Sequence, residues 1–229
     1  WEVGVNFAYN KNKITKLSVG DDKDTKSVNG MTVHMVGHAA NMYYVYEQIY
    51  DENGKPIEGL YKDRNNDGQI NEQELRPYNK SSPDVTLGLN TRLNWKAWDL
   101  SIAGHGSFGT YNYNAIAANH AGLSPTTIYA SESLSNRVKS AFDTNFQIAQ
   151  PLSDYYVQNA SFFRIDNIVL GWSFKNSKRI PFNGRIYGSV QNPFVFTKYK
   201  GVDPEVFGGY DGTLYPRPMT FLLGVNLNF

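Results

Sequence analysis

The residues whose types and spacing best suggest chemistry lie at positions 63–74, which read DRNNDGQINEQE. Oxygen-bearing side chains at the first, third, fifth, ninth and twelfth positions, with Gly at the sixth, match the calcium-binding loop of twelve residues. The predicted ligands, with Gln69 using its backbone carbonyl, are Asp63, Asn65, Asp67, Gln69, Asn71 and Glu74. Because every ligand is an oxygen atom, we expect a hard cation, a structural Ca²⁺ that stiffens a loop. The alternative is a polar surface turn that binds no ion.

Other chemistry finds little support in the sequence. The four His residues lack metal-ligand spacing, and no Ser lies in a GxSxG turn. There is no Cys, which excludes disulfides, thiolate metal sites and a Cys nucleophile. A net charge of +1 gives no electrostatic case for a nucleic-acid partner. We therefore expect a protein that is not an enzyme and does not bind nucleic acid.

A second candidate binding set is a short run that alternates Tyr with Asn. Its members are Tyr111, Asn112, Tyr113 and Asn114. Tyr rings stack on sugars or peptides, and Asn amides supply paired donors and acceptors. We predict that these residues contact a substrate; the alternative is that they only pack loops together.

The elements that position these residues follow a period of two. In the last stretch, Met219, Phe221, Leu223, Val225 and Leu227 alternate with mostly small or polar residues. This pattern predicts a strand with one apolar and one polar face. Similar strands are expected at about 1–11, 85–95, 98–108, 162–174 and 184–196. A small hairpin is expected around the turn at 51–54, and a helix-like run covers 132–142.

The connections between these strands alternate in length. Those at 12–83, 109–160 and 197–216 are long, and those near 96 and 175–183 are short. Outer-membrane barrels sort their loops in this way, with short periplasmic turns and long extracellular loops. We therefore predict an all-β fold, a transmembrane antiparallel β-barrel with its apolar face toward outer-membrane lipid. The alternative is a soluble, calcium-stabilised β-sandwich that binds glycans.

Two further expectations follow from the barrel. Aromatic residues should form a girdle at the periplasmic rim, and the candidates are Trp1, Trp95, Trp98 and Phe229. Six strands cannot enclose a wide lumen, and a free sheet edge is not tolerated in hydrocarbon, so further strands should pair with these. The sequence opens on Trp1 within a strand pattern and shows no signal peptide, so we expect it to be part of a longer polypeptide.

Several motifs carry a resemblance to a known family. The run TKYKGVDPE at 197–205, YPRP at 215–218 and the final strand resemble the carboxy-terminus of the SusC/RagA family of TonB-dependent outer-membrane transporters. The resemblance extends through SFFRIDNIVLGW at 161–172, the calcium-like loop and the opening strand, and so covers nearly the whole chain.

The resemblance implies a barrel of about 22 strands, plugged by an amino-terminal domain. Residues 1–229 would be the carboxy-terminal part of the barrel domain, without the plug. Such proteins lie in the outer membrane of Bacteroidota, cross it many times, and import oligosaccharides or peptides. They work with a SusD-like surface lipoprotein and take energy from the TonB complex, which the amino-terminal part contacts. The family's closing aromatic residue, a barrel-assembly signal, maps onto Phe229.

Overall fold

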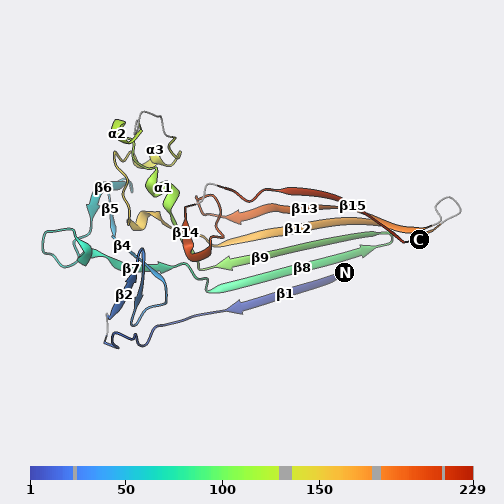
Figure 1. Cartoon of the computed structure of the whole chain (residues 1–229), viewed down its shortest axis with the longest axis horizontal. Helices are drawn as coiled ribbons and strands as arrows, with labels where there is room; N and C mark the ends of the chain where they lie inside the picture. Colours follow the sequence, from blue (N-terminus) through green and yellow to red (C-terminus); the bar gives the residue numbers. More distant parts are fainter. Residues whose placement is uncertain (23–24, 129–135, 177–181, 213–214, 229) are drawn as a thin grey trace.

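The structure is a computed structural model and describes residues 1–22, 25–128, 136–176, 182–212 and 215–228. Within these residues the largest element is an antiparallel sheet of six strands, which lie side by side in chain order (Figure 1). The strands are β1 (Glu2–Tyr9), β8 (Val85–Trp95), β9 (Trp98–Phe108), β12 (Phe162–Phe174), β13 (Asn183–Thr197) and β15 (Thr220–Asn228). All six expected strands, and the all-β fold class, are confirmed.

The two faces of this sheet differ, as the alternating sequence predicts. On β15, Phe221 and Leu223 are 72% and 82% exposed, and on β1 Phe7 is 67% exposed. The register keeps these apolar residues on one face, because Val190 pairs with Phe221 and Ile186 with Val225. The opposite face carries polar side chains such as Asp99, Arg185 and Asn226. The sheet is therefore one layer with an uncovered apolar face, which does not fit the sandwich alternative.

A tight turn connects two strands at one end of the sheet, and long connections join strands at the other end. Lys96, at φ 55°, and Ala97 join β8 to β9, where Trp95 pairs with Trp98. A bulge in β12 between Ile165 and Asn167 shifts the register against both neighbouring strands. In Figure 1 the three long connections all lie at the end opposite the β8–β9 turn. This sorting of the loops is as predicted.

The long connections build small sheets of their own within the described residues. One contains β2 (Lys26–Asn29), β3 (Thr32–Met35), β4 (Met42–Val45) and β7 (Arg76–Lys80), and another contains β10 (Tyr111–Asn114), β11 (Val157–Asn159) and β14 (Tyr210–Asp211). The hairpin of β5 (Gln48–Tyr50) and β6 (Pro56–Tyr61) is the one expected around the turn at 51–54.

The helices of the described residues are short and lie in the same connections. They are η1 (Glu72–Glu74), α1 (Ala115–Asn119), α2 (Pro125–Ile128), α3 (Ala141–Thr144), η3 (Asp154–Tyr156) and η4 (Phe207–Gly209). The prediction of a helix at 132–142 is largely wrong for the residues that the structure describes. Residues 136–140 are not helical, and α3 begins only at Ala141. Residues 132–135 lie outside the described ranges. None of the helices in the described ranges has the length and apolarity needed to cross a membrane.

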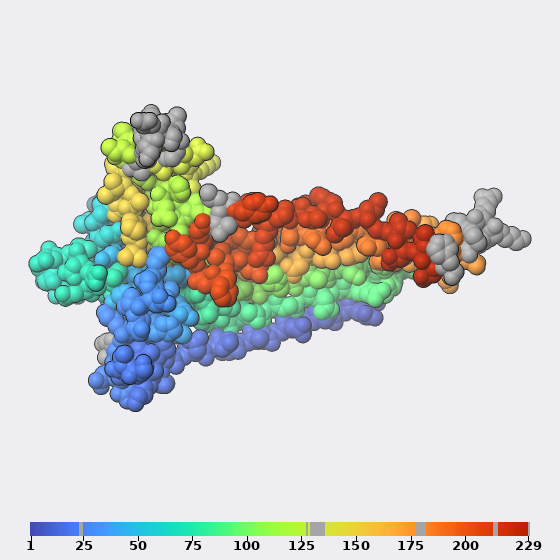
Figure 2. All heavy atoms as spheres, in the orientation of Figure 1, coloured from blue at the N-terminus to red at the C-terminus, as the bar shows by residue number. Residues whose placement is uncertain are grey.

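The hydrophobic core lies among the loops and not against the sheet. Its most buried large residues are Tyr43, Tyr156, Phe146 and Val45, each no more than 2% exposed. In Figure 2 the loop segments form a broad body at one end, from which the strands extend as a narrow slab. In the part of the chain that the structure describes, the loops therefore have a core of their own, whereas the sheet does not.

Candidate functional site

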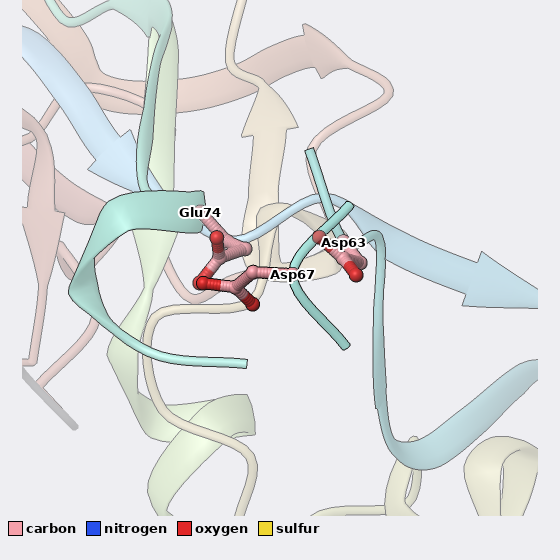
Figure 3. A group of neighbouring side chains, drawn as sticks. All are labelled: Asp63, Asp67 and Glu74. Carbon is pink, nitrogen blue, oxygen red and sulfur yellow. The ribbon is translucent and has the colours of Figure 1, made fainter. Parts of the chain in front are cut away.

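The loop at 63–74 brings three of its predicted ligands together. One carboxylate oxygen each from Asp63, Asp67 and Glu74 lies within 4.8 Å of the others (Figure 3). The loop joins β6 to β7, and Asn66 and Gly68 turn it at φ 61° and 77°. Left-handed backbone of this kind favours Asn and Gly, which explains these residue types in the motif.

Backbone N–H groups hold the side chains of the loop in place. Asp63 accepts hydrogen bonds from the backbone nitrogens of Asn66 (2.6 Å) and Gly68 (2.8 Å). Asp67 accepts one from the nitrogen of Gln69 at 2.8 Å. The side chain of Asn65 accepts one from the nitrogen of Asp67 at 2.9 Å. Such local bonds pre-form the turn before any ion is considered.

Glu74 has the least solvent contact of the three acids. It is 0% exposed, and its Oε2 accepts a hydrogen bond of 2.7 Å from the backbone nitrogen of Asn71. Its other oxygen, Oε1, has no hydrogen-bond partner among the described residues. Because a buried charge without partners is costly, Oε1 is the atom of this loop that most needs a further partner.

The remaining predicted ligands have other contacts. Asn71 caps η1, with its side-chain oxygen accepting from the nitrogen of Gln73 at 2.9 Å. Asn65 turns its amide nitrogen toward Asp67 Oδ2 (2.9 Å) and the side-chain oxygen of Gln73 (3.2 Å). Gln69 is exposed. The sequence did not predict that Gln73 lies beside the acids, because the eleventh position of the calcium-binding motif supplies no ligand.

An ion-pair chain that the motif does not reveal supports the loop. Arg64 lies 3.0 Å from Glu47, which is also 3.3 Å from Arg76. Arg76 in turn lies 2.7 Å from Asp154, which also accepts from the nitrogen of Gln48 at 3.0 Å. Burial raises the pKa of Asp154, opposed by these two partners. The chain connects residues far apart in sequence, so spacing alone gives no signal of it.

The polar face of the sheet carries an ion pair that crosses a strand. Arg185 on β13 donates to Asp99 on β9 at 2.9 and 2.5 Å, reaching over β12. The strand between them has Gly171 at this point. If Gly171 were replaced by a residue with a side chain, the new Cβ would lie 2.4 Å from Arg185 and 2.6 Å from Asp99. A residue with a side chain would therefore block the pair.

A second polar cluster joins the sheet to the connection before β15. Arg164 donates to Asp203 at 2.7 Å, and Arg217 lies 2.9 Å from Glu205. His105 lies 3.4 Å from the other oxygen of Glu205. His105, Glu205 and Arg217 line a cavity of about 600 Å³. These residues were not predicted as a site, because β9, β12 and a distant loop each contribute to it.

The run Tyr111–Asn114 forms β10 and is mostly buried. Asn112, Tyr113 and Asn114 are 1%, 2% and 3% exposed. Asn112 donates to the carbonyl of Pro204 at 2.8 Å, and Asn114 caps α1. The carbonyl of Tyr111 accepts from the hydroxyl of Tyr43 at 2.8 Å. These contacts pack the loops together, which is the alternative stated in the sequence analysis. They leave three of the four residues little surface for a substrate.

Comparison with known proteins gives the same class as the sequence motifs. No family model matches the chain. Along its whole length the chain is 41% identical to the TonB-dependent receptor SusC of Bacteroides thetaiotaomicron, of which it covers 24%. It is also 27% identical, along its whole length, to the TonB-dependent receptor P3 of Formosa agariphila, of which it covers 27%.

The solved structures agree in fold. A structure of the RagAB peptide transporter superposes with a TM-score of 0.75 and 23% identity, and the match covers 99% of this chain and 26% of that one. A structure of the RagAB peptide importer in its closed-closed state gives a TM-score of 0.74. The fold and the similarity together define the chain as part of a TonB-dependent receptor.

Within that class the chain belongs to the SusC/RagA family, which confirms the resemblance in its motifs. The chain spans about a quarter of the length of these relatives. Their names are those of receptors, transporters and importers and not of enzymes.

Proposed function

We propose that the chain supplies the carboxy-terminal strands of an outer-membrane importer that takes up oligosaccharides or peptides, driven through TonB. The similarity to SusC over the whole chain is the observation that carries the proposal. RagAB, whose structure is similar to this chain, is a peptide transporter, which supports import as the activity. A SusD-like lipoprotein is the expected partner at the surface, and TonB would engage the part of the receptor that precedes these strands.

The two faces of the sheet fit this role. An apolar face with Leu223 82% exposed suits contact with acyl chains, since water would make that exposure costly. The polar face, with Arg185 and Asp99 paired across it, suits a hydrated lumen. Trp1, Trp95 and Trp98 are 85%, 63% and 46% exposed at the end away from the loops, where a girdle is expected. Phe229, proposed as the assembly signal, lies outside the described residues.

The cavity beside His105, Glu205 and Arg217 is the surface that we assign to cargo in this part of the receptor. It lies where the polar face meets the loop that precedes β15, and it offers both charged and neutral hydrogen-bonding groups. Phe162 and Phe207 add aromatic surface to its lining. Polar groups beside rings are common to sugar and peptide recognition, so the cargo class is left to experiment.

A matched pair of Arg substitutions tests the orientation of the sheet. In the full-length receptor, Leu223→Arg places a charge on the apolar face, and Thr220→Arg places one on the polar face of the same strand, opposite the neutral Gln191. Arg facing lipid at mid-bilayer costs about 2–4 kcal/mol, whereas a luminal Arg costs little. We expect Leu223→Arg to lower the amount of folded receptor in the outer membrane and Thr220→Arg to leave it unchanged. Equal tolerance of both variants would contradict the proposal.

The import activity has its own test. A host strain without the receptor is complemented with the wild type, and growth on oligosaccharides is compared with growth on peptides as sole carbon source. Rescue on one of these, abolished by deletion of TonB, supports import and names the cargo class. The import proposal would be refuted if growth on every oligosaccharide and peptide tried were the same with and without the receptor.

A further inference from the structure

We infer that residues 63–74 bind one Ca²⁺ through the carboxylates of Asp63, Asp67 and Glu74. The side-chain oxygen of Asn65 and the backbone carbonyl of Gln69 are further oxygen ligands. Two independent observations carry this inference. The carboxylate oxygens of the three acids converge within 4.8 Å. The second observation is Glu74 Oε1, which is buried and has no hydrogen-bond partner among the described residues.

The charge balance of the loop calls for a cation. Three carboxylates that lie so close repel one another, and the repulsion is strongest where Glu74 is shielded from water. The one basic residue of the sequence 63–74, Arg64, is held by Glu47 at 3.0 Å. A divalent ion between the acids would relieve the repulsion and supply Glu74 Oε1 with a partner.

The ligand types select calcium among divalent ions. The converging atoms are all oxygens, which disfavours zinc and other metals that prefer nitrogen or sulfur. Mg²⁺ demands near-ideal octahedral geometry and gives up its waters reluctantly. Ca²⁺ accepts irregular sites with more ligands at longer distances, and the spacing of residues 63–74 is that of its twelve-residue loop.

Ion binding should change the contacts of the Asn65 side chain. The amide nitrogen of Asn65 now donates to Asp67 Oδ2 at 2.9 Å, where it places a partial positive charge beside the acids. With Ca²⁺ bound, the amide turns its oxygen toward the ion, which breaks its bonds to Asp67 and to Gln73 and releases Asp67 for coordination. Asn71 retains its role as the cap of η1 and reaches the ion only through water.

The position of the loop gives the ion a structural consequence. Residues 63–74 connect the β5–β6 hairpin to β7, and Arg64 and Arg76 both pair with Glu47 on the hairpin side. An ion that fixes both ends of the loop therefore fixes the hairpin relative to the four-stranded loop sheet. The inference does not depend on the import proposal, because it concerns the order of one external loop.

Calcium titration of the full-length receptor tests the inference. The receptor is purified in detergent, stripped with EDTA and titrated with CaCl₂ in a calorimeter, as wild type and as Glu74→Gln. The matched control is Glu72→Gln, an exposed acid of the same η1 turn that is not part of the cluster. We expect the wild type and the control to bind one more Ca²⁺ than Glu74→Gln, with a Kd of roughly 10⁻⁴–10⁻³ M or tighter.

Limited trypsin digestion provides a second measurement. Arg64 has a side chain that is 43% exposed, so the chain can be cut after it. Ca²⁺ should slow this cut by about tenfold or more in the wild type and in Glu72→Gln, and not in Glu74→Gln. Asp67→Asn, at an exposed position, should also lose the protection without a risk to folding.

Three results would overturn the inference. One is equal calcium stoichiometry in the wild type and in Glu74→Gln. Another is protection of Arg64 by Mg²⁺ but not by Ca²⁺ at equal concentration. The third is a digestion rate that Ca²⁺ leaves unchanged in the wild type.

Discussion

The ion pair that crosses over Gly171 permits a quantitative prediction for Gly171→Ala. The new Cβ would lie 2.4 Å from the guanidinium of Arg185 and 2.6 Å from Asp99. An ordinary contact begins near 3.4 Å, so one or both side chains must move by about 1 Å, which is enough to break bonds of 2.9 and 2.5 Å. Hydrogen bonds to charged groups contribute about 1.5–3 kcal/mol each when partly shielded.

The pair is partly shielded, since the side chains of Arg185 and Asp99 are 30% and 13% exposed. Residual solvent screening lowers the cost, because both side chains keep some contact with water. We therefore expect Gly171→Ala to lower the free energy of unfolding of the full-length receptor by about 1–3 kcal/mol. The control is Gly188→Ala on the adjacent strand, where the nearest atom to the new Cβ is at 3.9 Å.

Unfolding in urea, followed by Trp fluorescence of the receptor in detergent, measures this difference. A double-mutant cycle with Asp99→Ala assigns the effect to the pair, because Gly171→Ala should cost much less once Asp99 is gone. The reasoning fails if Gly171→Ala and Gly188→Ala behave alike, or if the cost of Gly171→Ala is the same in both backgrounds.

Three further predictions concern the loop body, and hydrogen exchange in the full-length receptor measures each. Phe146→Ala, at 1% exposure, should destabilise the loops by about 3–5 kcal/mol, whereas Phe142→Ala, at 64% exposure, should change their stability by less than about 0.5 kcal/mol. Tyr43→Phe removes a hydroxyl placed 2.8 Å from two loop carbonyls and should cost about 1–3 kcal/mol, seen as faster exchange around η4. Burial raises the pKa of Asp154 above its ordinary 3.8, so the folded loops bind its proton more tightly than the unfolded chain does. Their stability should therefore fall as pH rises from about 3.8 through the raised pKa, and Asp154→Asn should remove that part of the pH dependence.

The strands of the sheet could be predicted from sequence because each has a face that only lipid or a core would accept. The alternation of Phe221, Leu223 and Val225 with Gly224 and Asn226 is a local signal, and period two fixes both the element and its faces. The convergence of Asp63, Asp67 and Glu74 was equally predictable, since these acids and the turn between them lie within twelve residues.

The contacts that could not be predicted join residues far apart in the chain. The Arg76–Asp154 pair spans 78 positions, and the Arg185–Asp99 pair spans 86. In a single sequence, neither a period nor a residue spacing indicates that two residues so far apart form a pair. The run Tyr111–Asn114 illustrates the same limit, because its polar groups suggested a binding surface until the fold showed them bonded to Pro204 and α1.

The loops and the sheet are stabilised in different ways, and this difference bears on where the chain functions. The loops bury Tyr43, Phe146 and Tyr156 in a common core, so they gain stability as an ordinary soluble domain does. Among the described residues the sheet has no such core, since its apolar face is exposed at Phe7 and Leu223, and β1 and β15 each pair with a described strand on one side only. In water both features would favour aggregation. Acyl chains against the apolar face and neighbouring strands at both edges would remove both costs, and this is the setting that the proposed function gives the sheet.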